Sequence, residues 1–151
     1  MVLFGGFVNG ERMNATYTFN FSTNEWSKLQ TKGDKLPCPR AGHSALIYSN
    51  EVSDFMYIFG GKGEDNDKMN DLWRLDLNSN TWEQLIAENA PIMRSGHSVV
   101  RYMDYMLLFG GIFEITKELN DLHLYDLISG KWTNLFEDDG QMSPRNNDTP
   151  K

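Results

Sequence analysis

Three histidines and one cysteine are the side chains of this sequence best suited to bind a metal ion. His43 and His97 lie 54 residues apart in two copies of the same segment, Arg-x-Gly-His-Ser. A shared metal site needs both imidazoles to converge, and equivalent positions of successive repeats are usually too far apart for that. We therefore expect each histidine to be hydrogen-bonded within its own repeat, close to Arg40 or Arg94.

The other candidate ligands do not form a recognisable metal site either. Cys38 is the only cysteine, which excludes an intrachain disulfide and any zinc site built from several thiolates. The acidic run 64–67 resembles part of a calcium loop but lacks the glycine at position six and the closing glutamate. His123 stands where Trp73 and Tyr17 stand in the other repeats, so we expect it to pack between repeats. The sequence thus predicts no catalytic residue, no metal and no cofactor.

A pair of glycines follows a phenylalanine at three places in the sequence. Because glycine-rich loops can bind phosphate groups, a phosphate site has to be considered at each pair. No Lys-Ser or Lys-Thr follows these pairs and no helical pattern begins there, so a phosphate site is not expected. The glycines should instead supply positive φ angles, or room for close approach, where a strand leaves its sheet. Asp71 and Asp121 are expected to bond the turn backbone at the start of the next strand.

These residues belong to a repeat of about 50 residues, which is the signature of a repeat architecture. Phe-Gly-Gly occurs at 4–6, 59–61 and 109–111. A tryptophan follows each copy, as Trp26, Trp82 and Trp132. Between the glycines and the tryptophans, three segments align without a gap, at 13–26, 69–82 and 119–132.

Each complete repeat contains four short β-rich segments separated by turn residues. In the second copy they are 44–48, 55–59, 72–77 and 81–85. Their apolar–polar alternation is incomplete, as expected for strands whose sheet is packed on both faces. No segment has a sustained helical period, so the chain is predicted to be all-β, with each tryptophan buried between neighbouring sheets.

The aromatic-Gly-Gly, the Asn-Asp-Leu strand opening, the tryptophan and the Arg-x-Gly-His-Ser start together resemble the kelch motif. The resemblance implies blades of a β-propeller, each a four-stranded antiparallel sheet, around a central channel. The partial propeller is placed at 1–145, with a disordered or truncated tail at 146–151. Blades are expected at about 1–30, 40–86 and 94–136. The first blade lacks its first strand, so eleven strands form an incomplete ring.

The resemblance also implies that partners bind the loops between second and third strands, with the loops that connect blades. The former are expected at 7–13, 62–68 and 112–118. Their cations would either meet an acidic peptide or be solvated loop charges. These cations are Arg12, Lys62, Lys68 and Lys117. Phe113 and Ile115 either contact a partner or tuck into the channel wall.

Fourteen Lys and Arg stand against 21 Asp and Glu, and the net charge of −7 disfavours nucleic acid and anionic membrane surfaces. With no signal-like or membrane-spanning segment and a single cysteine, a cytoplasmic protein is expected. The resemblance implies a non-catalytic module that binds a protein or peptide, for example as adaptor or scaffold in a ubiquitin ligase. The alternatives are a kelch-fold enzyme (metal-dependent oxidase, epimerase or specifier protein) and a cytoskeletal or axonemal component.

Three blades leave two edges with unpaired backbone groups and half-uncovered seams, whereas closed propellers have about four to eight blades. Two explanations stay open. The sequence is part of a longer protein that supplies the missing blades, or two copies, or this chain and another, associate into a closed ring.

Overall fold

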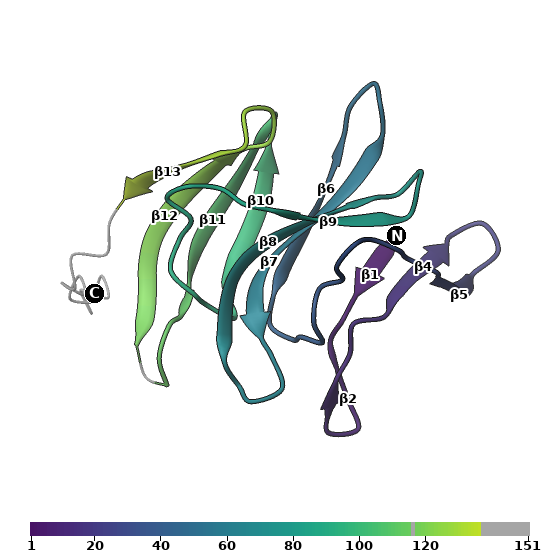
Figure 1. Ribbon diagram of the computed structural model, residues 1–151, viewed down its shortest axis with the longest axis horizontal. Helices are drawn as coiled ribbons and strands as arrows, with labels where there is room; N and C mark the ends of the chain where they lie inside the picture. Colours follow the sequence, from purple (N-terminus) through teal and green to yellow (C-terminus); the bar gives the residue numbers. More distant parts are fainter. Residues whose placement is uncertain (116, 137–151) are drawn as a thin grey trace, which may run out of the picture.

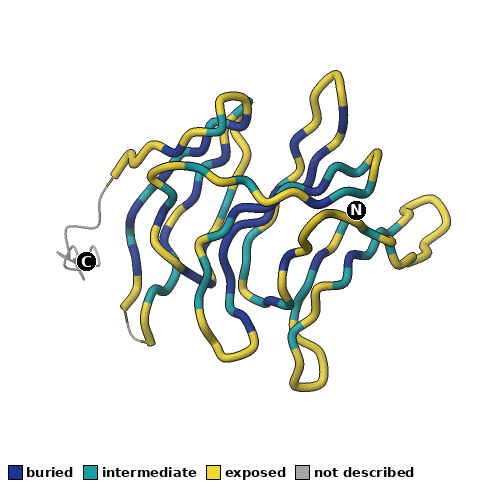
Figure 2. The backbone as a smooth tube through the Cα atoms, viewed as in Figure 1, coloured by how far each residue is buried: buried dark blue, intermediate teal, exposed yellow. Residues whose placement is uncertain are grey.

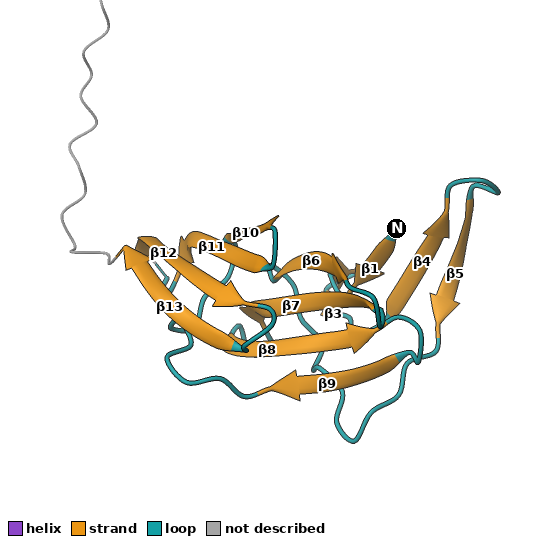
Figure 3. Cartoon of the chain, turned by 90° about the horizontal axis from the view of Figure 1, so that it is seen from above, coloured by secondary structure: helices purple, strands orange, loops and turns teal. Residues whose placement is uncertain are grey.

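The computed structural model describes residues 1–115 and 117–136, which consist of strands, turns and loops (Figure 3). Three antiparallel sheets stand side by side, with the N-terminal sheet at one end and the C-terminal sheet at the other (Figure 1). The predicted all-β class and the open ring are confirmed. The described residues contain no apolar helix that could cross a membrane. The tail expected at 146–151 lies outside the described residues.

The second and third blades each have four strands joined in sequential order. The second contains β6 (Ser44–Ser49), β7 (Asp54–Lys62), β8 (Lys68–Asp76) and β9 (Thr81–Leu85). The third contains β10 (Ser98–Tyr102), β11 (Tyr105–Ile112), β12 (Glu118–Asp126) and β13 (Lys131–Phe136). Short polar turns close the last hairpin of each blade, because an aspartate oxygen accepts hydrogen bonds from two backbone N–H groups of the turn.

The first blade has three strands, so the prediction that it lacks its first strand is confirmed. They are β1 (Val2–Phe4), β4 (Thr16–Asn20) and β5 (Glu25–Leu29). A separate hairpin, β2 (Phe7–Val8) and β3 (Glu11–Arg12), replaces the loop expected at 7–13. Asn9 and Gly10 form its turn with φ angles of 51° and 90°, and Asn-Gly is the preferred pair for such a turn. The described chain therefore has thirteen strands rather than eleven.

The middle strands of the second blade are longer than the sequence predicts, because their ladder continues past the glycine pair. Gly60 and Gly61 have φ angles of 63° and 99°, as expected, and the register shifts there. They form a bulge inside the strand rather than its end, and Lys62 still pairs with Lys68. The Gly61 N–H donates to the carbonyl of Arg94 at 2.9 Å, so the next blade holds this bulge in place. The third blade repeats the register shift.

Both faces of the second blade are buried, as its incomplete alternation predicts. Along β7, Phe55, Tyr57 and Phe59 pack in the core shared with the third blade, whereas Met56 and Ile58 pack in the core shared with the first. Successive side chains of a strand point to opposite faces, so this one strand contributes to two hydrophobic cores. Buried backbone accordingly runs through the second and third blades, while the turns at the ends are exposed (Figure 2).

A tryptophan and a phenylalanine join neighbouring blades at each seam. Trp82 packs against Phe4 with ring centroids 5.0 Å apart and planes at 65°, and Trp132 packs against Phe59 at 5.3 Å and 60°. Both tryptophans are buried, as predicted. Trp26 is 51% exposed, so the prediction is wrong for this residue. No described blade precedes the first one to supply its phenylalanine.

The linker from the first blade to the second also touches the outer edge of the second. Lys32 donates its N–H to the carbonyl of Asn80 at 3.0 Å and accepts the N–H of Trp82 at 2.7 Å. These bonds form a single parallel bridge beside β9. The outermost strand of the second blade is therefore partly paired with its own linker.

Candidate partner-binding face

The hairpins between the second and third strands of the blades project from one end of the molecule, at the bottom of Figure 1. Besides β2–β3, they are the β7–β8 and β11–β12 hairpins, whose tips follow Lys62 and Ile112. Ala41 and Ser95, at the starts of their blades, form two-hydrogen-bond bridges with these two residues. The base of each of these two hairpins is thus fixed by backbone bonds, and the loop at the tip lies beyond it.

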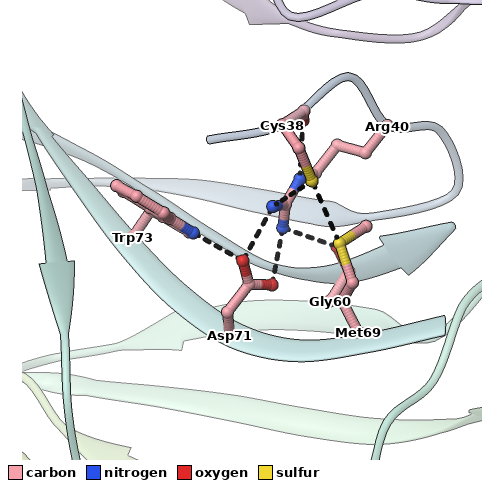
Figure 4. A network of polar contacts seen from close by, with 6 residues as sticks. All are labelled: Cys38, Arg40, Gly60, Met69, Asp71 and Trp73. Atoms are coloured by element: carbon pink, nitrogen blue, oxygen red, sulfur yellow. Dashed lines mark hydrogen bonds and ion pairs between the residues drawn. The ribbon is translucent and has the colours of Figure 1, made fainter. Parts of the chain in front are cut away.

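A buried arginine network lies beside the base of the second hairpin (Figure 4). Arg40 is fully buried, and its two terminal nitrogens each donate to one oxygen of Asp71 at 2.7 Å. Nη1 also donates to the carbonyl of Gly60 at 3.1 Å, and Trp73 Nε1 donates to the same aspartate at 2.6 Å. The network therefore joins the start of the blade to its glycine bulge and its third strand.

Arg94 makes the equivalent contacts in the third blade. It donates to the Asp121 carboxylate at 2.6 and 2.7 Å and to the carbonyl of Gly110 at 2.9 Å. His123 is buried and replaces the tryptophan, with Nε2 2.7 Å from Oδ2 of Asp121 in its own blade. Burial disfavours the charged form of Asp121, but hydrogen bonds from Arg94 and His123 outweigh it and hold the pKa of this carboxyl well below its usual range.

The predicted bonds from the Asp71 and Asp121 side chains to the turn backbone are not among the hydrogen bonds of the described chain, because each carboxylate pairs with an arginine distant in the sequence. A signal for this pairing is present in the repeats. An arginine opens the second and third units, and an aspartate follows it in both, 31 and 27 residues later.

The two repeated histidines pack edge-on against the phenylalanine of the preceding blade. Ring centroids are 5.5 Å apart for His43 with Phe4 and for His97 with Phe59. Neither ring nitrogen of His97 has a hydrogen-bond partner, so the expected bond within the blade is wrong for this residue. Burial, assisted by the nearby arginine charge, lowers the pKa of each histidine to about 4. In the described part of the chain, no three His, Cys, Asp or Glu side chains gather as metal ligands would.

Among the predicted contact residues, Arg12 connects two hairpins. Its Nη2 donates to Asn66 Oδ1 at 2.5 Å, and its Nη1 donates to the carbonyl of Glu64 at 3.2 Å. The guanidinium also lies 5.5 Å from the ring centroid of Phe7. Arg12 therefore braces the hairpin of the second blade from the first through its two terminal nitrogens, while its Nε has no hydrogen-bond partner among the described residues.

Lys62 and Lys68, here called the lysine pair, face each other across the β7–β8 hairpin. Like charges directly opposite one another destabilise a hairpin, and neither lysine forms an ion pair with another described residue. The equivalent pairs are Phe7 with Arg12 in the first blade and Ile112 with Glu118 in the third. These facing pairs therefore carry positive charge on the first two hairpins and not on the third.

A groove of about 680 Å³ lies between the second and third hairpins. It is lined by Asn66, Asp67, Lys68, Met93, Phe113, Glu114 and Ile115. Three predicted contact residues thus meet there, whereas Arg12 and Lys62 do not line it. Lys117 lies with Nζ 5.8 Å from the Phe113 ring centroid. Ile115 is 96% exposed, so it is not tucked into a wall.

Met93 is a groove residue that sequence reasoning missed. The sequence feature that could have indicated it is simple: Met93 is an apolar residue directly before the repeated arginine, at the end of a linker. The linker returns to the hairpin end of the molecule at that point, which places this side chain in the groove.

Comparison with known proteins agrees with this architecture. Residues 1–149 match the family model described as the KLHDC2/KLHL20/DRC7 Kelch-repeats domain. The chain belongs to the kelch-repeat family.

Curated kelch relatives match only part of their length. Kelch domain-containing protein 1 of Mus musculus is 35% identical over 88 residues, 57% of this chain and 20% of the relative. F-box/kelch-repeat protein At1g51550 of Arabidopsis thaliana is 33% identical over 113 residues, 65% of this chain and 22% of the relative. Host cell factor 2 of Homo sapiens is 33% identical over 120 residues, which cover 66% of this chain and 14% of the relative. The kelch chain therefore spans no more than 22% of the length of these three proteins.

The kelch motif residues and the candidate contact residues occupy different parts of each blade. The repeated arginines are fully buried, and the aspartates and glycine pairs lie with them at the hairpin bases. Lys68, Phe113 and Ile115 lie near the tips, where the three repeats differ in sequence. The kelch repeat thus determines the scaffold, whereas the hairpin tips differ in charge and apolar character from one blade to the next.

Proposed function

We propose that this kelch chain is a non-catalytic module that binds a protein or peptide in the groove between its second and third hairpins. The observation that carries the proposal is the exposed isoleucine beside a partly buried aromatic ring and an unpaired cation. Ile115 gains almost no burial from folding, and a partner can bury it together with Phe113. Lys68 supplies a charge at the same groove.

The partner segment that fits has an apolar side chain close to one carboxylate. The apolar side chain packs in the groove, and the carboxylate relieves the repulsion within the lysine pair. The groove also contains two acidic side chains, Asp67 and Glu114, which disfavour a long acidic run. We therefore propose a mixed apolar and acidic segment rather than a polyacidic one.

A narrower proposal is that the module serves as an adaptor or scaffold within a larger assembly such as a ubiquitin ligase. The Arabidopsis relative, which is named for an F-box together with kelch repeats, supports this role. The acidic composition and the single cysteine favour action in the cytoplasm.

The test compares proteins captured from a native lysate by the wild-type chain and by two groove variants, Ile115→Asp and Lys68→Glu. Partners of the groove should be lost from both variants. Val52→Asp is the matched control, because Val52 is an 81% exposed apolar residue in the β6–β7 turn, at the opposite end of the second blade (Figure 1). Partners recovered equally by all four proteins would refute the groove as the binding site.

A captured partner can then be reduced to a synthetic peptide whose affinity is measured by fluorescence anisotropy. Ile115→Asp and Lys68→Glu should each weaken binding about tenfold or more. Added salt should weaken binding to the wild type but have little effect on binding to Lys68→Glu, because the charge contact is already lost. Salt dependence that is unchanged in Lys68→Glu would contradict the proposed carboxylate contact.

A further inference from the structure

Asn66, at the tip of the second hairpin, contacts the first hairpin and also lines the groove. Arg12 reaches it from the first hairpin and donates from Nη2 to its Oδ1 at 2.5 Å. The groove in which Asn66 takes part lies between the second and third hairpins. One exposed side chain is therefore held from the first blade and presented to a cavity that the third blade helps to form.

The contact with Arg12 determines which end of the Asn66 amide carries the oxygen. A guanidinium has only hydrogen-bond donors, so the atom that meets Arg12 Nη2 is the amide oxygen. A flipped amide would place two donors against each other, and the hydrogen-bond network is what decides such assignments. Nδ2 of Asn66 forms no hydrogen bond with another described residue. Its two N–H donors are therefore left for a ligand.

The backbone of the hairpin tip also holds Asn66 in place. Its φ angle is 62°, in the left-handed region that asparagine adopts more readily than most residues. Its N–H donates to the carbonyl of Gly63 at 3.1 Å, and the Gly63 N–H donates to the carbonyl of Asp67 at 2.9 Å. Arg12 Nη1 adds a bond to the carbonyl of Glu64 at 3.2 Å. The free end of the amide is thus positioned before any ligand binds.

Lys68 supplies a second set of donors to the same groove. An ammonium group has three N–H donors and no acceptor, and the oxygen of Asn66 is already used by Arg12. Both side chains therefore offer only donors to a ligand. An ionised carboxylate has two oxygens that only accept, so it can satisfy both side chains, whereas a carboxamide brings an NH₂ group against one of them.

We propose that Asn66 and Lys68 together bind one carboxylate of the partner segment, and that Arg12 is a positioning residue that acts through Asn66. This inference rests on the proposed function, because it concerns the same groove. Asn66 is then a residue that determines specificity for an acidic side chain over its amide. Asp67 and Glu114 also line the groove and repel further carboxylates, so the site accepts a single one.

The decisive variant is Asn66→Asp, which keeps an oxygen for Arg12 and replaces the free N–H donors with a second acceptor. Its bond with Arg12 becomes charge-assisted, so hydrogen–deuterium exchange of the tip amides 63–67 should not become faster. A carboxylate ligand should bind at least about tenfold more weakly, because it loses a donor and meets a like charge. A purely structural role for Asn66 predicts unchanged binding, since the contact with Arg12 is kept.

Selection from a displayed library of random short peptides supplies the ligand. Peptides enriched on the wild-type chain but not on Ile115→Asp should contain an apolar residue close to one Asp or Glu. One such peptide is then synthesised with the acidic residue and with the corresponding amide, and both affinities are measured by fluorescence anisotropy. The wild type should favour the acidic form about tenfold or more. Asn66→Asp should lose most of this preference, because its new carboxylate accepts from the amide.

Two further variants test the positioning role and the added charge. Arg12→Leu keeps a long side chain but frees the Asn66 amide to rotate, so the acidic peptide should bind about two- to tenfold more weakly. Asn50→Asp makes the same chemical change in the β6–β7 turn, where Oδ1 accepts the N–H groups of Val52 and Ser53 at 2.9 and 3.0 Å. It lies outside the groove and should leave the affinity unchanged.

The outcomes separate this inference from the proposed function. If no enriched peptide depends on Ile115, the groove is refuted, and this inference with it. If Ile115-dependent peptides bind equally well to the wild type and to Asn66→Asp, or if the wild type does not distinguish the acidic form from the amide, only the carboxylate contact with Asn66 is overturned. Unchanged affinity in Arg12→Leu would overturn the positioning role of Arg12.

Discussion

The arginines that begin the second and third blades, Arg40 and Arg94, are charges enclosed by the protein. Each is fully buried, and each meets both oxygens of an aspartate and a glycine carbonyl. Bidentate contacts of this kind are strong and geometrically specific. An isolated buried charge is costly, so losing one partner should cost more than the intact pair contributes.

Removing the carboxylate of Asp121 should therefore destabilise the third blade strongly. We expect Asp121→Leu to lower the free energy of unfolding by about 3–5 kcal/mol, because Arg94 remains buried without its partner. The double variant Arg94→Met with Asp121→Leu should regain part of this loss, and urea unfolding measures both. A double variant no more stable than the single one would contradict this account.

The histidines in the seams predict a pH dependence. Burial lowers the pKa of His97 to about 4 in the folded chain, against 6.5 for an ordinary histidine. Between these values the unfolded chain binds protons more readily, so stability should fall as pH drops from 6.5 towards 4 and be regained above 6.5. The loss at pH 5 is about 2 kcal/mol per histidine.

Urea unfolding at pH 7 and pH 5 measures this loss. His97→Phe keeps the aromatic contact with Phe59 and removes the titrating group, so it should reduce the difference between the two pH values. His43→Phe should do the same at the other seam. If the double variant loses as much stability between pH 7 and pH 5 as the wild type, other titrating groups cause the pH dependence.

At the scale of strands and hairpins, the repeat predicted where the strands lie but not where the middle ones end. The sequence favours the end of a strand at Phe-Gly-Gly, because glycine weakens strands. The ladder instead continues past the glycine bulge in both four-stranded blades, including the third, which no described blade follows. A bulge shifts the register without ending the pairing, and a glycine pair alone does not distinguish a bulge from a strand end. The β2–β3 hairpin, by contrast, was predictable from Asn9-Gly10 alone.

The second glycine of the pair offers a matched test of how closely the start of a blade packs on its own bulge. Gly61 and Gly6 hold the same repeat position with φ angles of 99° and 105°. A Cβ at Gly61 would lie 2.9 Å from the Cβ of His43, whereas a Cβ at Gly6 would meet nothing within 4 Å. Gly6→Ala should cost about 1–3 kcal/mol of backbone strain, and Gly61→Ala about 1–3 kcal/mol more for the clash.

Chemical unfolding of the two variants separates the contributions. Equal destabilisation would show that the contact with His43 is relieved by small shifts of the backbone. In that case strain at the positive φ angle would account for the glycine by itself.

At the scale of the whole molecule, the blades differ in how completely they are covered. Blades resemble repeats that contact only their neighbours, so stability should be greatest in the blade with two neighbours. Hydrogen–deuterium exchange should be slowest for amides of β7 and β8 and fastest for β4 and β5, which belong to a blade covered on one side. If amides of β7 exchange as fast as amides of β4, packing at the seams contributes little to the stability of the blades.

The sequence could predict the internal seams but not the outer faces. Trp82 and Trp132 are buried because a blade precedes each of them, and their motif implies that arrangement. Trp26 has the same motif and is half exposed, because burial is a property of the neighbour rather than of the residue. The groove residues were identified as loop residues, but their convergence depends on the distance between hairpins, which no single repeat encodes.

The bridge between Lys32 and β9 has a consequence for how such chains behave at high concentration. An open outermost strand offers free N–H and C=O groups on which strands from other molecules can add, the first event of fibril growth. Here the linker occupies the groups of Asn80 and Trp82 before a foreign strand can reach them. The connection between two blades thus occupies part of this edge, and we expect it to slow the addition of foreign strands at the central blade.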